Sequence, residues 1–226
     1  MDSIPFDFCD AVVGTIKKIP LVDVPFHDAK WNKALQDHTA NRKRFNLCLG
    51  YHARNDKWLY CLLNTRFRSN IPFATLLKRV GPKYMRIDSI EVAARWRLRG
   101  YWIAIETSKE EFHALIKSLI PFLNFPRLTL HDADSKIPER DLDQLRSSFA
   151  KINICSFCSS CNRRSAIEFA KQLMHQDTLV KKITIVRERG LLSAAVADYR
   201  ATGSVVHYET KRFLDGVYRT YLRFVH

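Results

Sequence analysis

The chain has 226 residues, of which 46% are hydrophobic and 12% aromatic, and its formal net charge is +14. This composition can build a sizeable core, so it excludes a wholly disordered chain. No apolar run reaches the roughly 20 residues needed to cross a bilayer. The length fits one large domain, or a small N-terminal module followed by a larger body.

The positive charge is concentrated in one part of the chain. Residues 1–40 hold four Lys or Arg against six Asp or Glu, whereas residues 41–100 hold fourteen against three. Such a basic segment can attract nucleic acid, acidic lipid or an acidic protein. It can also be a solvated face that keeps the protein soluble. Charge alone therefore leaves the partner open.

The first residues and the cysteines predict the compartment. Residues 1–5 have neither the basic region nor the apolar run of a secretory signal. Without such a signal, the six cysteines are expected to be thiols of a reducing compartment rather than disulfides. We therefore expect a cytoplasmic or nuclear protein with no membrane segment.

Two helices are expected in the N-terminal segment, residues 1–42. The first covers residues 6–18, and its apolar side chains recur at a spacing of four, which defines one face of a helix. These residues are Phe8, Val12 and Ile16. The second covers residues 29–38 and places Trp31 and Leu35 on one side.

From residue 43 onward, strand-like and helix-like segments alternate. Residues 45–51 and 57–62, joined by a turn-like stretch, predict a β-hairpin. The later strand-like runs are 102–105, 127–130, 151–154, 182–185 and 204–207. The helix-like stretches are 72–79, 109–123, 139–149, 164–175, 191–199 and 210–224.

This alternation predicts an α/β fold in which helices connect parallel strands. The strand-like runs are separated by 22 to 31 residues, a length similar to that of leucine-rich repeats, although the asparagine-bearing consensus is absent. We therefore expect an irregular, leucine-rich-repeat-like β/α body over residues 43–226. Whether it forms an open array or a compact layer stays open. In either case, stacked units would share a core and leave one face exposed.

The N-terminal segment resembles an F-box. Ile4-Pro5 stands where the F-box pattern opens with Leu-Pro, and Trp31 follows Pro5 by 26 residues, the spacing at which that pattern closes. Pro25 and His27 depart from the pattern, which there continues a helix and carries an aliphatic residue. The order of elements in the body is similar to the F-box-associated regions of lineage-expanded invertebrate families.

The resemblance implies a non-catalytic substrate receptor without a cofactor. F-box helices pack on a Skp-family adaptor and so connect a protein target to a cullin-based ubiquitin ligase. The adaptor face would consist of Pro5, Phe8, Val12, Ile16, Leu21 and Trp31. The residues alone leave a second interpretation open, in which both helices pack their apolar faces on the protein's own core.

The basic segment supports an alternative function, a nucleic-acid-binding module over residues 42–102. Its candidate phosphate-binding residues are Arg42, Lys43, Arg44, Arg95, Arg97 and Arg99. The last three alternate along the chain, so a strand would align them on one face. Neighbouring aromatic residues could stack on bases. No established nucleic-acid-binding motif accompanies them.

Three cysteines form a C-x-x-C-x-x-C run, Cys155, Cys158 and Cys161. Thiolates at this spacing can bind zinc or an iron–sulfur cluster, but structural zinc sites use four ligands and no fourth cysteine follows. We therefore expect a Ser/Cys-rich loop after a strand and no metal. The chain also lacks P-loops, nucleophile elbows and dinucleotide-binding glycine motifs, so nothing in it favours an enzyme.

Overall fold

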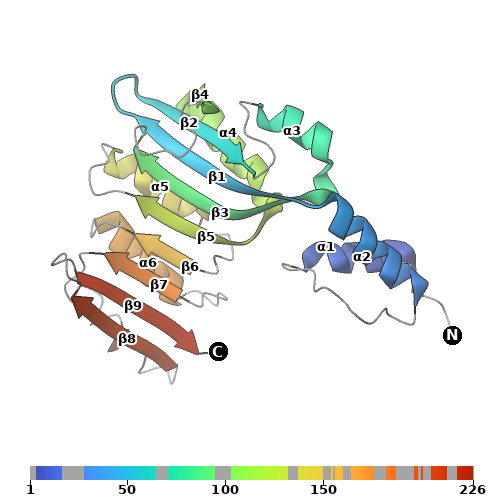
Figure 1. Cartoon of the computed structure of the whole chain (residues 1–226). Coiled ribbons are helices and arrows are strands. Elements are labelled where there is room, and N and C mark those ends of the chain that lie inside the picture. Colours follow the sequence, from blue (N-terminus) through green and yellow to red (C-terminus); the bar gives the residue numbers. More distant parts are fainter. Residues whose placement is uncertain are drawn as a thin grey trace.

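The computed structural model describes residues 4–16, 28–64, 71–94, 103–131, 137–149, 154, 156–159, 164–175, 182–186, 196–197, 200, 205–212 and 218–225. In these residues, a pair of helices precedes a mixed α/β body built on one sheet (Figure 1). None of the helices in this part of the chain has the length and apolar character that a membrane span requires.

The helices begin and end where local sequence signals favour it. Their bounds are Phe6–Thr15 (α1), Ala29–Asn41 (α2), Phe73–Val80 (α3), Lys109–Leu119 (α4), Glu139–Phe149 (α5) and Arg164–His175 (α6). Asp28 caps α2 by accepting from the Lys30 backbone, and Ser108 forms a capping box with Glu111 at α4. Gly81 follows α3 with a φ of 82°, a conformation that glycine adopts at little cost.

Nine strands form a single mixed sheet in the described residues. They are Lys43–His52 (β1), Lys57–Leu63 (β2), Met85–Ala94 (β3), Ile105–Thr107 (β4), Leu123–His131 (β5), Ser156–Ser159 (β6), Lys182–Val186 (β7), Val205–Arg212 (β8) and Tyr218–Val225 (β9). Their order across the sheet is β4-β2-β1-β3-β5-β6-β7-β9-β8.

The centre of the sheet is parallel and runs in chain order. Strands β1, β3, β5, β6 and β7 lie side by side and pair in parallel. Antiparallel strands complete both ends, β2 and β4 at one end and β9 and β8 at the other. The predicted α/β class with parallel strands and crossover helices is thus confirmed.

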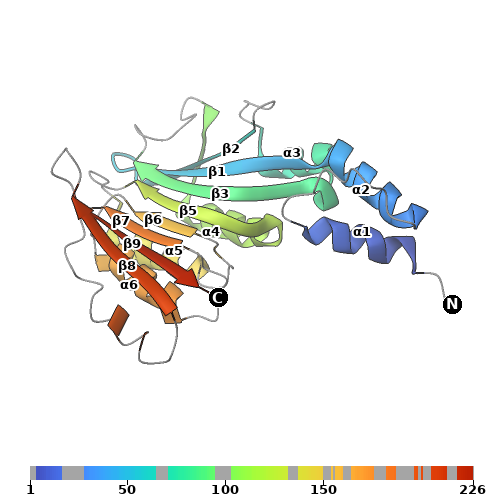
Figure 2. The same cartoon turned by 60° about the horizontal axis from the view of Figure 1, so that its bottom comes forward.

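One core cluster joins the sheet to α3, α4, α5 and α6. Figure 2 shows α4, α5 and α6 together on one side of the sheet. At its centre, the Trp58 ring of β2 stacks on Phe112 of α4, with the ring centroids 4.2 Å apart and the planes 7° from parallel. The strands contribute alternate residues to this cluster, such as Leu47 and Leu49 of β1, as the two-residue period of a strand requires.

The structure adds a strand that the sequence pattern did not predict. β3 lies beside β1 at the centre of the sheet, in a stretch for which no element was expected. Its alternation is interrupted, because the pairing register with β1 shifts between Phe45 and Asn46 and the register with β5 shifts between Ile87 and Ser89. Such a bulge inserts an extra residue and breaks the period of two.

Three other predicted segments need correction. The run at 102–105 was expected to be a repeating strand, but β4 is a short antiparallel edge strand over 105–107. Of the predicted run at 151–154, only residue 154 is among the described residues, and it is not in a strand. The strand described next is β6 at 156–159, where Phe157 is buried against Phe169 of α6. The predicted helix over 210–224 is wrong, because β8 and β9 form an antiparallel pair there.

The remaining predicted elements are found close to their expected bounds. The hairpin is β1 and β2, and the segments 72–79, 109–123, 139–149 and 164–175 contain α3, α4, α5 and α6. Strand runs at 127–130, 182–185 and 204–207 fall within or overlap β5, β7 and β8. Of the predicted helix over 191–199, the structure describes residues 196–197, which are helical.

Candidate interaction sites

The N-terminal helix pair has a small core of its own. Helices α1 and α2 bury Cys9, Val13, Ala34 and Leu35 against one another. The helix pair lies beyond the amino-terminal ends of β1 and β3 (Figure 1). The apolar residues that pack inside the pair are therefore offset by one position from the predicted stripe at Phe8 and Val12.

The predicted adaptor-binding residues lie largely outside that small core. Phe8 is 54% exposed and Ile4 is 42% exposed, and they are large apolar side chains open to solvent. Trp31 is half-buried against the helix-pair core, and its ring meets Phe8 edge-on, with centroids 6.3 Å apart. The other members of the predicted face divide as follows: Pro5 is exposed, Val12 and Ile16 are half-buried, and Leu21 lies outside the described residues.

Two arginines hold the carboxyl end of α1, one from the body and one from the residue that ends α2. Arg86 of β3 donates from Nη2 to the Gly14 carbonyl at 2.7 Å. Arg42 donates to the carbonyls of Val13 and Ile16. A Cβ added at Gly14 would lie 3.4 Å from Arg86 Nη2, which is an ordinary contact distance. Cations at a helix C-terminus satisfy its last carbonyl groups and complement the helix dipole.

A buried histidine completes the attachment of the helix pair. His38 Nε2 lies 3.3 Å from Asp10 Oδ1, and Arg42 Nη2 lies 3.3 Å from His38 Nδ1. Asp10 also accepts from Lys83 at 3.1 Å, and the Tyr84 ring packs edge-on against the imidazole. Burial and the Arg42 guanidinium lower the pKa of His38, although Asp10 acts in the opposite direction. Arg86 adds to the lowering. His38 is therefore neutral at neutral pH.

We expect His38 to make the stability of the protein sensitive to mild acid. An unfolded chain protonates His38 at about pH 6.5, whereas the folded chain protonates it only at lower pH. The unfolded state thus binds more protons as the pH falls below about 6.5, and stability is lost on acidification. Urea unfolding at about pH 7.5 and about pH 5.5 should show wild type losing more stability than His38→Gln. Equal losses in the two proteins would contradict this assignment.

The basic residues of the alternative function are partly used inside the protein. Arg42 binds α1, as described above, and Arg44 Nε lies 2.6 Å from Asp88 Oδ2. Lys43 is half-buried at the start of β1. Arg95, Arg97 and Arg99 lie outside the described residues. The described members of this set therefore do not form an open row of cations.

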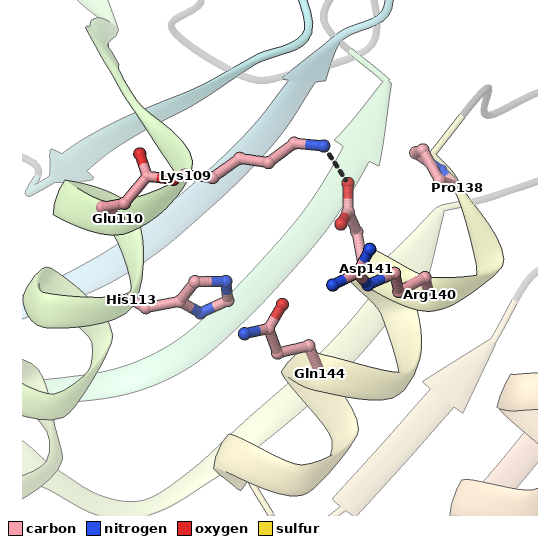
Figure 3. Close-up of a pocket in the computed structure, with 7 residues that line it drawn as sticks. All are labelled: Lys109, Glu110, His113, Pro138, Arg140, Asp141 and Gln144. Atoms are coloured by element: carbon pink, nitrogen blue, oxygen red, sulfur yellow. Dashed lines mark ion pairs between the residues drawn. The ribbon is translucent and has the colours of Figure 1, made fainter.

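A pocket of about 350 Å³ opens between the amino-terminal turns of α4 and α5 (Figure 3). Its lining residues are Lys109, Glu110, His113, Pro138, Arg140, Asp141 and Gln144. The side chains of His113 and Gln144 point toward each other across it (Figure 3). The volume is at the lower end of ligand-binding pockets. Most of the lining residues carry polar or charged groups, which could bind polar groups of a ligand.

A chain of charges fixes one wall of this pocket. Lys109 Nζ lies 2.9 Å from Asp56 Oδ1 and 3.3 Å from Asp141 Oδ2, and Tyr51 donates to Asp56. Burial and the contact with Asp56 raise the pKa of Tyr51 to about 12. The hydrogen bond from Tyr51 and the one from Lys109 lower the pKa of Asp56. Asp141 is only 5% exposed, and Lys109 compensates its charge.

Sequence reasoning missed this second group of residues. Asp56 belongs to the β1–β2 turn, Lys109 begins α4, and Asp141 lies in the first turn of α5. The Ser108–Glu111 capping motif was a local signal, because it places Lys109 at the first position of a helix. Nothing in the sequence indicated that the β1–β2 turn and the first turns of α4 and α5 lie together.

A polar surface lies on the face of the sheet opposite to the large core. The parallel register aligns polar residues of β1, β3, β5 and β6 in two rows. The first row is Asn46, Ser89, Arg127 and Ser156, and the second contains Glu91, Thr129 and Cys158. Ser89 donates to Asn46 at 2.8 Å, and His131 Nε2 lies 3.2 Å from Glu91 Oε1. We call this set the polar sheet face.

The cysteine run is only partly described. Cys158 is a half-buried thiol within β6 rather than in a loop after a strand. Cys155 and Cys161 lie outside the described residues. Within the part of the chain that the structure describes, no three His, Cys, Asp or Glu residues gather in an arrangement suited to a metal ion.

The fold defines the chain as a mixed α/β protein with an attached helix pair. No family model, no curated protein and no solved structure matches it. The two surfaces and the pocket described above are therefore the features that bear on its function.

Proposed function

We propose that this protein is a non-catalytic receptor that binds two proteins, one through the helix pair and one through the α/β body. The observation that carries the proposal is the exposed apolar group of Ile4 and Phe8 beside Trp31 on the helix pair. The pair already buries its own core, on which Trp31 packs, so the exposed side chains of Ile4 and Phe8 are not needed for that internal packing. Exposed aromatic residues of this kind are typical anchors of protein interfaces.

The resemblance to an F-box indicates the first partner, a Skp-family adaptor of a cullin-based ubiquitin ligase. The segment holds two helices in the expected order. Phe8 is exposed and Val12 half-buried, whereas α1 buries Cys9 and Val13 in the helix-pair core. An apolar helical stripe left outside the core fits a groove on another protein. In this proposal, residues 4–41 supply the docking helices.

The body would bind the protein target, and its strand order supports a leucine-rich-repeat-like architecture. Consecutive parallel strands lie next to one another, and the helices that follow them join one core cluster. Stacked β/α units of this kind leave the opposite face of the sheet for partners. The polar sheet face and the pocket between α4 and α5 are therefore the candidate target sites.

The test is the affinity of the full chain for a purified Skp-family adaptor, measured by calorimetry. Phe8→Asp should weaken binding about tenfold or more, because loss of a central aromatic anchor costs over about 1.4 kcal/mol. The matched control is Gln36→Asp, which adds the same charge at an exposed position of α2. Both variants should unfold at the wild-type urea midpoint, because neither residue is buried.

Two results would overturn the proposed adaptor role. One is a folded wild-type chain that does not bind the adaptor. The other is Phe8→Asp binding as tightly as Gln36→Asp. Binding of the wild type to RNA or DNA that falls steeply with salt would instead support the nucleic-acid alternative, because phosphate contacts release counterions.

A further inference from the structure

Two cysteines that do not belong to the C-x-x-C-x-x-C run face each other across the β1–β2 hairpin. Cys48 of β1 is the direct register partner of Cys61 of β2 in the antiparallel pair. Both are thiols in this structure, and both are buried. They share a small cluster with Leu59, on the face of the sheet opposite to the Trp58–Phe112 core. Both side chains thus lie on the same face of the hairpin.

This register satisfies the geometric requirement for a disulfide. Directly opposed residues of antiparallel strands have Cα atoms about 4.5 or 5.5 Å apart, depending on the type of pair. Disulfides span Cα separations of about 4.4 to 6.8 Å. Both types of pair therefore fall within the range of Cα separations that disulfides span. A shift of the register by one residue would place the two side chains on opposite faces.

Part of the cover over the two thiols comes from residues at the edge of the sheet. Ile103 and Ala104, both partly exposed, pack on the cysteine cluster. They directly precede β4, an edge strand that pairs with β2 through Trp58, Leu59 and Tyr60. Short edge elements open locally at a lower free energy than the centre of a sheet. Local opening of β4 would admit a small oxidant to the thiols.

We propose that Cys48 and Cys61 form a redox-sensitive dithiol that hydroperoxides convert to a cross-strand disulfide. The thiolate of one cysteine attacks the peroxide O–O bond and becomes a sulfenic acid, releasing water from hydrogen peroxide. The second thiol then displaces a second water and forms the S–S bond. Two thiols are oxidised and one peroxide is reduced to two waters. This proposal does not depend on the receptor function.

The disulfide would also constrain a functional part of the body. It closes the segment from residue 48 to residue 61, which contains the β1–β2 turn and Asp56. Asp56 binds Lys109 at the wall of the α4–α5 pocket. Oxidation would therefore restrict the motion of the β1–β2 turn, which contributes Asp56 to the wall of this pocket.

The test uses the full chain with Cys155, Cys158 and Cys161 replaced by serine, which leaves Cys9, Cys48 and Cys61. The folded protein is treated with hydrogen peroxide, alkylated, and digested with trypsin without reduction. The expected product links the peptide of residues 45–54 to that of residues 58–66, with the loss of two hydrogens. The oxidised protein should melt about 3–10 °C higher than the reduced one, and the increase should disappear on reduction.

The controls distinguish a disulfide between Cys48 and Cys61 from non-specific oxidation of cysteines. Cys9 is equally buried but belongs to the helix-pair core, so its thiol should remain alkylatable after the protein is denatured. Cys61→Ser in the same background should abolish the linked peptides and the increase in melting temperature. The proposal is overturned if peroxide leaves Cys48 and Cys61 as thiols. It is equally overturned if Cys9 becomes linked to Cys48 as readily as Cys61 does.

Discussion

Replacing Trp58 by alanine is expected to lower the free energy of unfolding by about 3–5 kcal/mol, the usual cost of removing a buried aromatic side chain. Trp58 is only 1% exposed. Its ring stacks on Phe112 of α4 and meets Tyr51 edge-on, with centroids 5.4 Å away. The truncation leaves a cavity where β2 meets α4. Urea unfolding followed by circular dichroism would measure the loss.

Two control variants make this prediction specific to burial. Phe8→Ala removes an aromatic ring that is mostly exposed, so it should change stability by less than about 1 kcal/mol. Trp58→Phe should cost less than Trp58→Ala, because it keeps a stacked ring and removes a buried indole N–H for which the described residues supply no hydrogen-bond partner. If Trp58→Ala and Phe8→Ala unfold at the same urea concentration, the placement of Trp58 in the core is wrong.

Replacing Arg86 by methionine is expected to destabilise the protein by about 2 kcal/mol. Methionine keeps the apolar stem but removes the guanidinium, which donates to the Gly14 carbonyl from both Nε and Nη2. The carbonyl groups at the end of α1 would then lose a charged partner in a half-buried site. Urea unfolding gives the total loss. Hydrogen exchange of the α1 amides should show that the loss is local to the helix pair.

The matched control is Arg44→Met. Arg44 also lies at the start of a central strand, but it is largely exposed and faces Asp88 at 2.6 Å. Exposed ion pairs contribute about 0–1 kcal/mol, so this variant should be close to wild type. If both arginine variants lose the same stability, or if exchange in α1 is unchanged in Arg86→Met, Arg86 does not anchor the helix pair as described.

The anchoring residues matter for the proposed receptor as well as for stability. Asp10 of α1 reaches Lys83, and the carbonyl groups at the end of α1 reach Arg42 and Arg86. The helix pair is thus bound to the body at the start of β3 through polar contacts with Lys83 and Arg86. A receptor that joins two proteins needs such a defined connection between its two binding regions, because the linkage sets which part of a bound target faces the ligase.

Much of the fold follows from local sequence signals. Helices α4 and α6 show an apolar period of three to four residues, and the capping box of Ser108 marks the start of α4. The β1–β2 hairpin shows its alternation on both sides of the turn. The repeated order of strand and helix was enough to predict an α/β fold. These features are visible in sequence because each depends on residues a few positions apart.

Other elements were decided by contacts between distant residues. β3 contains a bulge that breaks its alternation, yet pairing with β1 and β5 stabilises it. Tyr221 and Phe224 show a spacing compatible with a helix, but β9 is held between β7 and β8 as a strand. In both places the ladder of hydrogen bonds from neighbouring strands outweighs the local preference.

The candidate sites divide in the same way. The sequence by itself determined the helix pair with its apolar stripe at Phe8, because helical periodicity is a local property. Only the tertiary structure decided that Cys9 and Val13, rather than Phe8, fill the space between α1 and α2. It alone brought Asp56, Lys109 and Asp141 together and set Cys48 opposite Cys61. These contacts depend on strand register and helix packing, which bring together residues that are far apart in the chain.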